Sequence, residues 1–130
     1  MPIVHIRSLA LPESVDMPAL LNKLAKDFAQ QAKIQLEHIS LDWQYIQPGH
    51  YFVNKQVHMQ QHVHQPPLIA ELIVPDVHSE KRQQQLLSLL AKLIHQHSHI
   101  ALNNIFISLQ VAQSGTIFDN GKIVTWPQKG

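Results

Sequence analysis

The chain has 130 residues, of which 45% are hydrophobic and only 15% charged, with 10 Lys and Arg against 9 Asp and Glu. This length suits a single domain over residues 1–130, and a net charge near zero without a dense basic run argues against nucleic-acid binding. Cysteine is absent, which excludes disulfides, thiol catalysis and thiolate metal sites. Neither a signal peptide nor an apolar span of membrane length is present, so we expect a cytoplasmic protein without membrane association.

The first expected element is a strand over residues 2–8, which Pro2 opens. A methionine that precedes a residue as small as proline is normally removed, and its removal would leave Pro2 with a free secondary amine. Burial or neighbouring cations lower the pKa of such an amine toward neutrality, so Pro2 is a candidate general base. The alternative is that Pro2 only opens the strand, where no backbone hydrogen-bond donor is needed.

A helix is expected after this strand, with Asp16 as its N-cap, Pro18 in its first turn and its end near Lys33. One face of this helix is apolar and carries Leu20, Leu21, Leu24, Ala25, Phe28 and Ala32. Residues 39–45 then alternate between apolar and polar side chains, which is typical of a half-buried strand. The dipeptide Pro48-Gly49 predicts a turn after that strand.

The second half repeats this order of elements at a constant interval of 66 residues. Matching positions at this interval are Leu20 and Leu86, Ile39 and Ile105, and Gly49 and Gly115. We interpret the agreement as an internal duplication, with repeats over about 2–57 and 68–124. A polar connector rich in Gln and His would join them over about 56–66.

Each half predicts a strand, a crossover helix, a second strand and a short hairpin. The second helix should begin after Ser79 as N-cap, and residues 117–124 predict a hairpin around Asn120-Gly121. Because such crossovers make the two strands of a half parallel, we expect an α/β, or two-layer α+β, fold with a four-stranded mixed sheet and two helices on one face. The other face, which includes His5 and Arg7, would need a partner, most simply other copies of the chain in a closed ring.

Two fused strand-helix-strand units that begin Met-Pro resemble the tautomerase superfamily over essentially the whole chain. This superfamily includes 4-oxalocrotonate tautomerase, the carboxymethyl-hydroxymuconate isomerases and macrophage migration inhibitory factor (MIF). The turn Gly49-His50-Tyr51 is similar to a Gly-His-Phe turn of 4-oxalocrotonate tautomerase, and the best local match is to a little-characterised branch that shares Arg7 and the hairpin Phe118-Asp119-Asn120-Gly121. The resemblance implies a tautomerase/MIF-like fold, a homotrimer and Pro2 as general base. It further implies keto-enol tautomerase activity, without a cofactor, on a small 2-oxo acid or enol.

The substrate-carboxylate arginines of the superfamily are missing from this chain. Their positions hold Pro12, Ser40, His78 and Phe106. The resemblance therefore leaves Arg7, Lys33 and His78 as candidate cations for a small-molecule carboxylate substrate, and Tyr51 as the aromatic wall of the pocket.

Two of these candidates have structural alternatives. Arg7 would pair with Asp42 or Glu71 across the sheet or the trimer interface, and Tyr51 would be an exposed hairpin residue. The missing arginines also favour a rival function from another class, a non-catalytic trimeric binding or scaffold protein that keeps the fold.

Histidine is unusually frequent, with 10 residues in the chain. The clusters are His58-x3-His62-x-His64, expected in a solvated polar loop, and His95-x-His97-x-His99, expected at the end of the second helix. Such clusters can bind zinc, nickel or copper, and a metal-binding protein is a third alternative. Neither stretch contains accompanying carboxylates, so we expect no metal site and interpret the histidines as compositional.

Overall fold

The computed structural model describes residues 1–127, so the expected domain over 1–130 extends three residues beyond the described part. The helices are α1 (Met17–Ala32) and α2 (Glu80–Ser98), with 3-10 turns η1 (Leu36–His38) and η2 (Leu102–Asn104). The strands are β1 (Ile3–Ser8), β2 (Ser40–Tyr45), β3 (Tyr51–Val53), β4 (Gln56–His58), β5 (Leu68–Pro75), β6 (Ile105–Ala112), β7 (Ile117–Asp119) and β8 (Lys122–Val124).

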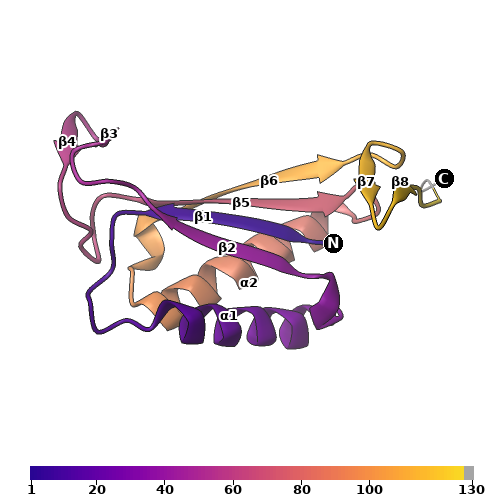
Figure 1. Cartoon of the computed structure of the whole chain (residues 1–130), viewed down its shortest axis with the longest axis horizontal. Coiled ribbons are helices and arrows are strands. Elements are labelled where there is room, and N and C mark those ends of the chain that lie inside the picture. Colours follow the sequence, from indigo (N-terminus) through magenta and orange to yellow (C-terminus); the bar gives the residue numbers. More distant parts are fainter. Residues whose placement is uncertain (128–130) are drawn as a thin grey trace.

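Four strands form one mixed sheet in the order β2-β1-β5-β6. Strand β1 runs parallel to β2 and β5 runs parallel to β6, whereas β1 and β5 are antiparallel. Both helices cover the same face of the sheet, and the β3–β4 and β7–β8 hairpins project at opposite ends of it (Figure 1). The predicted two-layer α+β fold with short hairpins is confirmed.

Local sequence signals define both ends of each helix. The side chain of Asp16 accepts a hydrogen bond from the Ala19 amide at 3.2 Å, and that of Ser79 accepts one from the Arg82 amide at 3.1 Å. Both predicted N-caps are therefore confirmed. Helix α1 ends at Ala32, and Lys33 forms its C-cap with a left-handed backbone at φ 59°.

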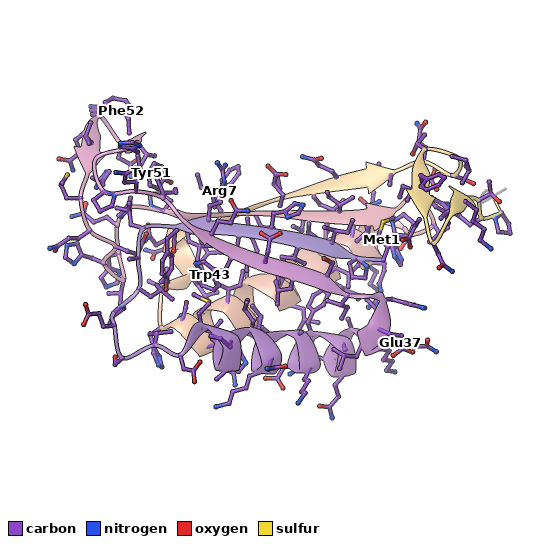
Figure 2. All side chains as sticks on the ribbon, viewed as in Figure 1. Met1, Arg7, Glu37, Trp43, Tyr51 and Phe52 are labelled. Carbon is purple, nitrogen blue, oxygen red and sulfur yellow. The ribbon has the colours of Figure 1, made fainter. Side chains whose placement is uncertain are left out.

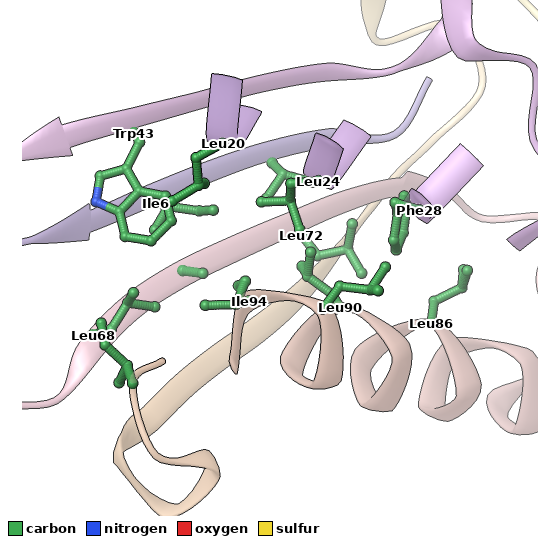
Figure 3. Close-up of a cluster of buried hydrophobic side chains, with 14 of the residues drawn as sticks. Ile6, Leu20, Leu24, Phe28, Trp43, Leu68, Leu72, Leu86, Leu90 and Ile94 are labelled. Atoms are coloured by element: carbon green, nitrogen blue, oxygen red, sulfur yellow. The ribbon is translucent and has the colours of Figure 1, made fainter. Parts of the chain in front are cut away.

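The core lies between the helices and the covered face of the sheet. Alternate residues of β1 and β5 point into it, as a half-buried strand requires. Figure 3 shows apolar side chains of α1, α2 and the strands in one cluster that includes Ile6, Leu24, Leu72 and Leu90. The indole of Trp43 donates a hydrogen bond to the Ser8 hydroxyl at 2.9 Å, so both buried polar groups have partners.

The two halves match in detail at the 66-residue interval. Turns η1 and η2, strands β3 and β7, and strands β4 and β8 begin at matching positions. Left-handed backbone conformations also recur in pairs, at Lys33 and His99, Gly49 and Gly115, Asn54 and Asn120, and Lys55 and Gly121. The two ends of the sheet are consequently built from the same parts, a 3-10 turn, the start of a central strand and a hairpin.

Candidate active site

The start of the chain lies in a pocket at the end of the sheet that carries the β7–β8 hairpin. This cavity of about 350 Å³, the N-terminal pocket, is lined by residues that include Met1, Glu37, His38, Ser40 and Asp119. Figure 2 shows Met1 beside the hairpin and Glu37 on the turn below it. Met1 and Asp119 also line an adjoining cavity of about 350 Å³. The terminal amino group thus belongs to a residue shared by two cavities.

The surroundings of this pocket shift the pKa of the terminal amine. Burial lowers the pKa of the Met1 amino group below its ordinary value of 8.0, because the charged form loses hydration. The negative charge of Asp119 opposes this shift and favours the ammonium form. An amine at this place in the fold is therefore neutral at lower pH than an exposed terminus.

The hairpin holds Asp119 in place over the terminus. Asp119 ends β7 directly before Asn120 and Gly121, whose left-handed backbone makes the tight turn. Lys122 is its cross-strand partner, but within residues 1–127 the two side chains form no salt bridge. Just beyond β8, the Trp126 indole donates a hydrogen bond to the Asp76 carboxylate at 2.7 Å, which ties the hairpin to the end of β5.

Pro2 is buried directly beneath this amine. Its carbonyl accepts a hydrogen bond from the Ser40 amide at 3.1 Å, which aligns the start of β1 with the start of β2. While Met1 is attached, the nitrogen of Pro2 is a peptide nitrogen and cannot titrate. Removal of Met1 would move the terminal amine one residue inward, onto a buried residue at the edge of the same pocket.

A second pocket occupies the opposite end of the sheet. This cavity of about 370 Å³ is lined by residues that include Tyr51, Val53, Pro67, Asn103 and Phe106. At the 66-residue interval these positions correspond to Ile117, Asp119, Met1, Glu37 and Ser40, all of which line the N-terminal pocket. The duplication has therefore produced two copies of one pocket, and only the N-terminal copy contains a terminal amine and carboxylates.

Arg7 and Tyr51 lie together, but far from Pro2. The positive charge of Arg7 acts against the effect of burial, which raises the pKa of the Tyr51 phenol above its ordinary value of 10.0. Arg7 lies five positions along an extended strand from Pro2, a span of roughly 16 Å. Figure 2 accordingly shows Arg7 toward the Tyr51 end and Met1 at the other end.

Tyr51 itself is buried, in contrast to the alternative that it is an exposed hairpin residue. Only 7% of its surface is accessible, and its hydroxyl donates a hydrogen bond to the Pro67 carbonyl at 2.7 Å. Tyr51 therefore forms a wall of the second pocket, within a single chain.

The two other candidate cations are placed differently. Lys33 is exposed at the end of α1, and His78 is half-buried in the turn between β5 and α2, where its carbonyl accepts a hydrogen bond from the Gln83 side chain at 3.3 Å. Neither residue lines the N-terminal pocket. The four residues expected to bind substrate are thus not gathered around Pro2 in one chain.

Within residues 1–127, Arg7 does not form the expected pairing with Asp42 or Glu71. Asp42 instead accepts a hydrogen bond from the ring of His5, its neighbour across the parallel β1–β2 pair, at 2.6 Å. His5 and Asp42 are directly opposite each other in the register, whereas Arg7 is opposite Gln44. Over residues 1–127, no salt bridge joins Arg7 to Asp42 or Glu71.

The histidine clusters are also dispersed. His58 is buried in β4 and contacts the Val53 carbonyl at 3.0 Å, so the expectation that it lies in a solvated loop is wrong. His97 bonds to Asp27 of α1 at 2.8 Å, and His95 bonds to the Ile100 carbonyl at 2.7 Å. In the described part of the chain, no three His, Asp or Glu side chains converge in a way that could hold a metal ion.

Sequence reasoning did not single out Glu37, His38 or Asp119 as site residues. The signal for Asp119 was present in the repeat, because the residue that corresponds to Tyr51 in the second half is Ile117, two positions before Asp119. A pocket predicted at one hairpin therefore predicts a pocket at the other.

No family model and no curated protein matches the sequence. The chain does match solved structures. One is a native fused 4-OT, with a TM-score of 0.78 and 9% identity, over 93% of this chain and 94% of that chain. The structure of Pt0534 inactivated by 2-oxo-3-pentynoate has TM-score 0.77 and 17% identity, over 94% of both chains. A macrophage migration inhibitory factor homologue from Prochlorococcus marinus has TM-score 0.72 and 17% identity, over 94% of this chain and 98% of that chain.

This chain has the tautomerase/MIF-like fold. The tautomerase fold expected from the sequence is confirmed over nearly the whole chain, although the low identities extend the likeness to the fold alone. Among residues 1–127, no helix is both long and apolar enough to cross a membrane.

Proposed function

We propose that the protein is a cofactor-independent keto-enol tautomerase of the cytoplasm, with the terminal amine of Pro2 as its general base once Met1 has been removed. The substrate is a small enol or carbonyl compound that fits the N-terminal pocket of about 350 Å³. The observation that carries the proposal is the placement of the chain terminus in this pocket, where burial favours a neutral amine.

The chemistry needs few groups. The neutral amine accepts the O–H proton of the enol, and the resulting ammonium returns a proton to the neighbouring carbon, so the amine is regenerated. The hydroxyl of Ser40 and the ring of His38 line the same pocket and can donate hydrogen bonds to the oxygen as negative charge develops on it.

We also propose that the chain assembles as a homotrimer. A fused 4-OT with TM-score 0.77 and 10% identity, over 94% of both chains, is a symmetric trimer. In this chain, the hairpins expose Phe52 and Phe118 to 69% and 70%, each opposite an exposed Val57 or Ile123 in the next strand. Exposed apolar pairs at corresponding places in both hairpins support contacts with other copies. Arg7 could reach a terminal amine only from such a copy.

The competing function is a non-catalytic binding or scaffold protein. It is favoured by one observation, that no lysine or arginine among the described residues lines the N-terminal pocket. The two functions differ in one respect, because a scaffold does not need a free amine at Pro2.

The deciding experiment follows ketonisation of enolised phenylpyruvate and of its methyl ester, after intact mass has established that Met1 is absent. We expect Pro2→Ala to lower kcat/KM by about 100-fold, the scale of general base catalysis. A variant with an N-terminal extension keeps every side chain but places Pro2 in a peptide bond, and it should lose activity to the same degree. Equal rates in the wild type and both variants, with unchanged circular dichroism, would exclude the catalytic function.

A further inference from the structure

The N-terminal pocket has an unusual charge for a site expected to accept carboxylates. Its lining contains two carboxylates, Glu37 and Asp119, and no lysine or arginine within residues 1–127. The base must be a neutral amine when it accepts a proton, so it supplies no positive charge to the incoming substrate. The lining that this chain supplies therefore presents a net negative charge to an anionic substrate.

The second pocket shows that the fold does not require these carboxylates. It has a similar volume and the same backbone elements, yet Asn103 stands at the position of Glu37 and Val53 at the position of Asp119. The two acidic residues are thus confined to the copy of the pocket that contains the terminal amine. Lys122, the cross-strand partner of Asp119, lies outside the pocket lining and forms no salt bridge with Asp119 within residues 1–127.

We propose that Glu37 and Asp119 determine the substrate class of the N-terminal pocket, which accepts uncharged carbonyl compounds and their enols and disfavours carboxylates. This inference rests on the proposed function and narrows it, since the sequence alone left both 2-oxo acids and simple enols open. Like-charge repulsion acts as the selective element, because it penalises the anion without strengthening contacts to the neutral compound.

A covalent probe tests the inference without depending on turnover. The ynone 2-oxo-3-pentynoate carries a carboxylate, and its methyl ester is the matched neutral reagent. In either case the terminal amine adds to the alkyne carbon, forming one N–C bond, and its proton is transferred to the neighbouring carbon. The protein therefore gains the full mass of the reagent, and peptide mapping locates the label on Pro2 or, if it is retained, on Met1.

The measured quantity is the ratio of labelling rates, ester over acid, divided by the same ratio for a free model amine. We expect this normalised ratio to be about 10 in low salt for the wild type, because both carboxylates are exposed and act through water. The normalised ratio should fall toward 1 in the double variant that combines Asp119→Asn with Glu37→Gln. It should also fall toward 1 for the wild type in high salt. A change in the pKa of the amine alters both rates alike and cancels in the ratio.

The control is Glu80→Gln, which removes one negative charge from the first turn of α2, near this end of the sheet but outside the pocket lining, and is compared with each single pocket variant as well as with the double variant. It should leave the ratio unchanged. The inference is overturned if the wild type reacts at least as well with the acid, or if Glu80→Gln changes the ratio as much as the double variant does. The two proposals can fail separately. If the ester labels faster than the acid but ketonisation does not depend on Pro2, the proposed function is wrong and the inference about the charge of the pocket still holds.

Discussion

Single residues at the two ends of the sheet show how the duplicated pocket has diverged. At one end a buried tyrosine, Tyr51, donates its hydroxyl to the Pro67 carbonyl and closes the second pocket. At the other end the corresponding residue is Ile117, which lacks a polar group, and the terminal amine of Met1 stands where Pro67 has an internal peptide nitrogen. The same backbone thus supports a pocket without carboxylates or a free amine at one end and a pocket with both at the other.

The phenol of Tyr51 provides a test of its placement beside Arg7. Burial raises the pKa of Tyr51 above 10.0 and Arg7 acts in the opposite direction, because its positive charge favours the phenolate. We expect Arg7→Gln to raise the pKa of Tyr51 further, so that ultraviolet absorbance titration detects the phenolate at higher pH. Arg7→Lys should keep the wild-type titration, since it retains the charge. An unchanged titration in Arg7→Gln would contradict the placement.

The terminal amine gives a second prediction at this scale. Asp119 favours the charged form of the Met1 amine, and removal of Met1 would place the Pro2 amine at the edge of the same pocket, so we expect Asp119→Asn to lower the pKa of the Pro2 amine. The base is active when neutral, so the rising limb of the pH-kcat/KM profile should move to lower pH in this variant. A rising limb at the wild-type position, or at higher pH, would show that the amine and Asp119 are not coupled.

The sequence could indicate Pro2 because its position at the start of a strand is a local feature. It could not show how the candidate substrate-binding residues lie, because the proximity of Arg7 to Tyr51 depends on where the β3–β4 hairpin sits at the end of the sheet (Figure 1). The partner of Asp42 within the chain was mispredicted for a similar reason. Strand register, which the sequence leaves open, decides that His5 and not Arg7 lies opposite Asp42.

At the scale of secondary-structure elements, the sequence predicted the position of one hairpin better than that of the other. The dipeptide Asn120-Gly121 is a strong hairpin signal, and β7–β8 lies within residues 117–124 as expected. In the first half the corresponding dipeptide is Asn54-Lys55, which gives a weaker signal. The structure accordingly places β4 at Gln56–His58, inside the range 56–66 that was expected to be connector.

The unequal hairpins lead to a stability prediction. Lys55 adopts a left-handed conformation at φ 71°, where Gly121 stands at φ 80° in the other hairpin. This conformation costs a non-glycine residue roughly 1–2 kcal/mol, partly offset by the greater unfolded-state entropy of glycine. We expect Lys55→Gly to raise the free energy of unfolding by about 0.5–1 kcal/mol in thermal or urea denaturation. Lys55→Ala removes the same charge but keeps the strain, and should give no gain; equal gains in both would point to charge instead.

At the scale of the whole molecule, assembly depends on the face of the sheet that the helices do not cover, here called the bare face. A polar row crosses its middle, since Asp42, His5, Glu71 and Ser108 are successive neighbours across the four strands. Apolar side chains such as Ile3 and Ile73 accompany this row on the same face. Alternation in the sequence predicted which residues would face away from the helices, but what covers that face depends on other copies of the chain, which a single sequence does not describe.

Assembly gives the prediction at this scale. We expect the protein to behave in light scattering as a homotrimer, with three times the chain mass of 14.8 kDa. Ile73→Asp places a charge among the apolar side chains of the bare face, opposite Ile3, and should dissociate the assembly while circular dichroism stays unchanged. Gln30→Asp introduces the same charge on the exposed side of α1 and should leave the mass unchanged. A monomeric wild type would contradict the trimer.

Two alike pockets with one terminal amine per chain determine the stoichiometry of a reagent that reacts only inside these pockets and only with an amine. A trimer would present six such pockets, yet saturation would be reached at three equivalents, one for each chain. An observer who counted cavities alone would interpret this value as half-of-sites reactivity and would look for communication between subunits. Here the missing half has a covalent origin, because the nitrogen of Pro67 is committed to a peptide bond.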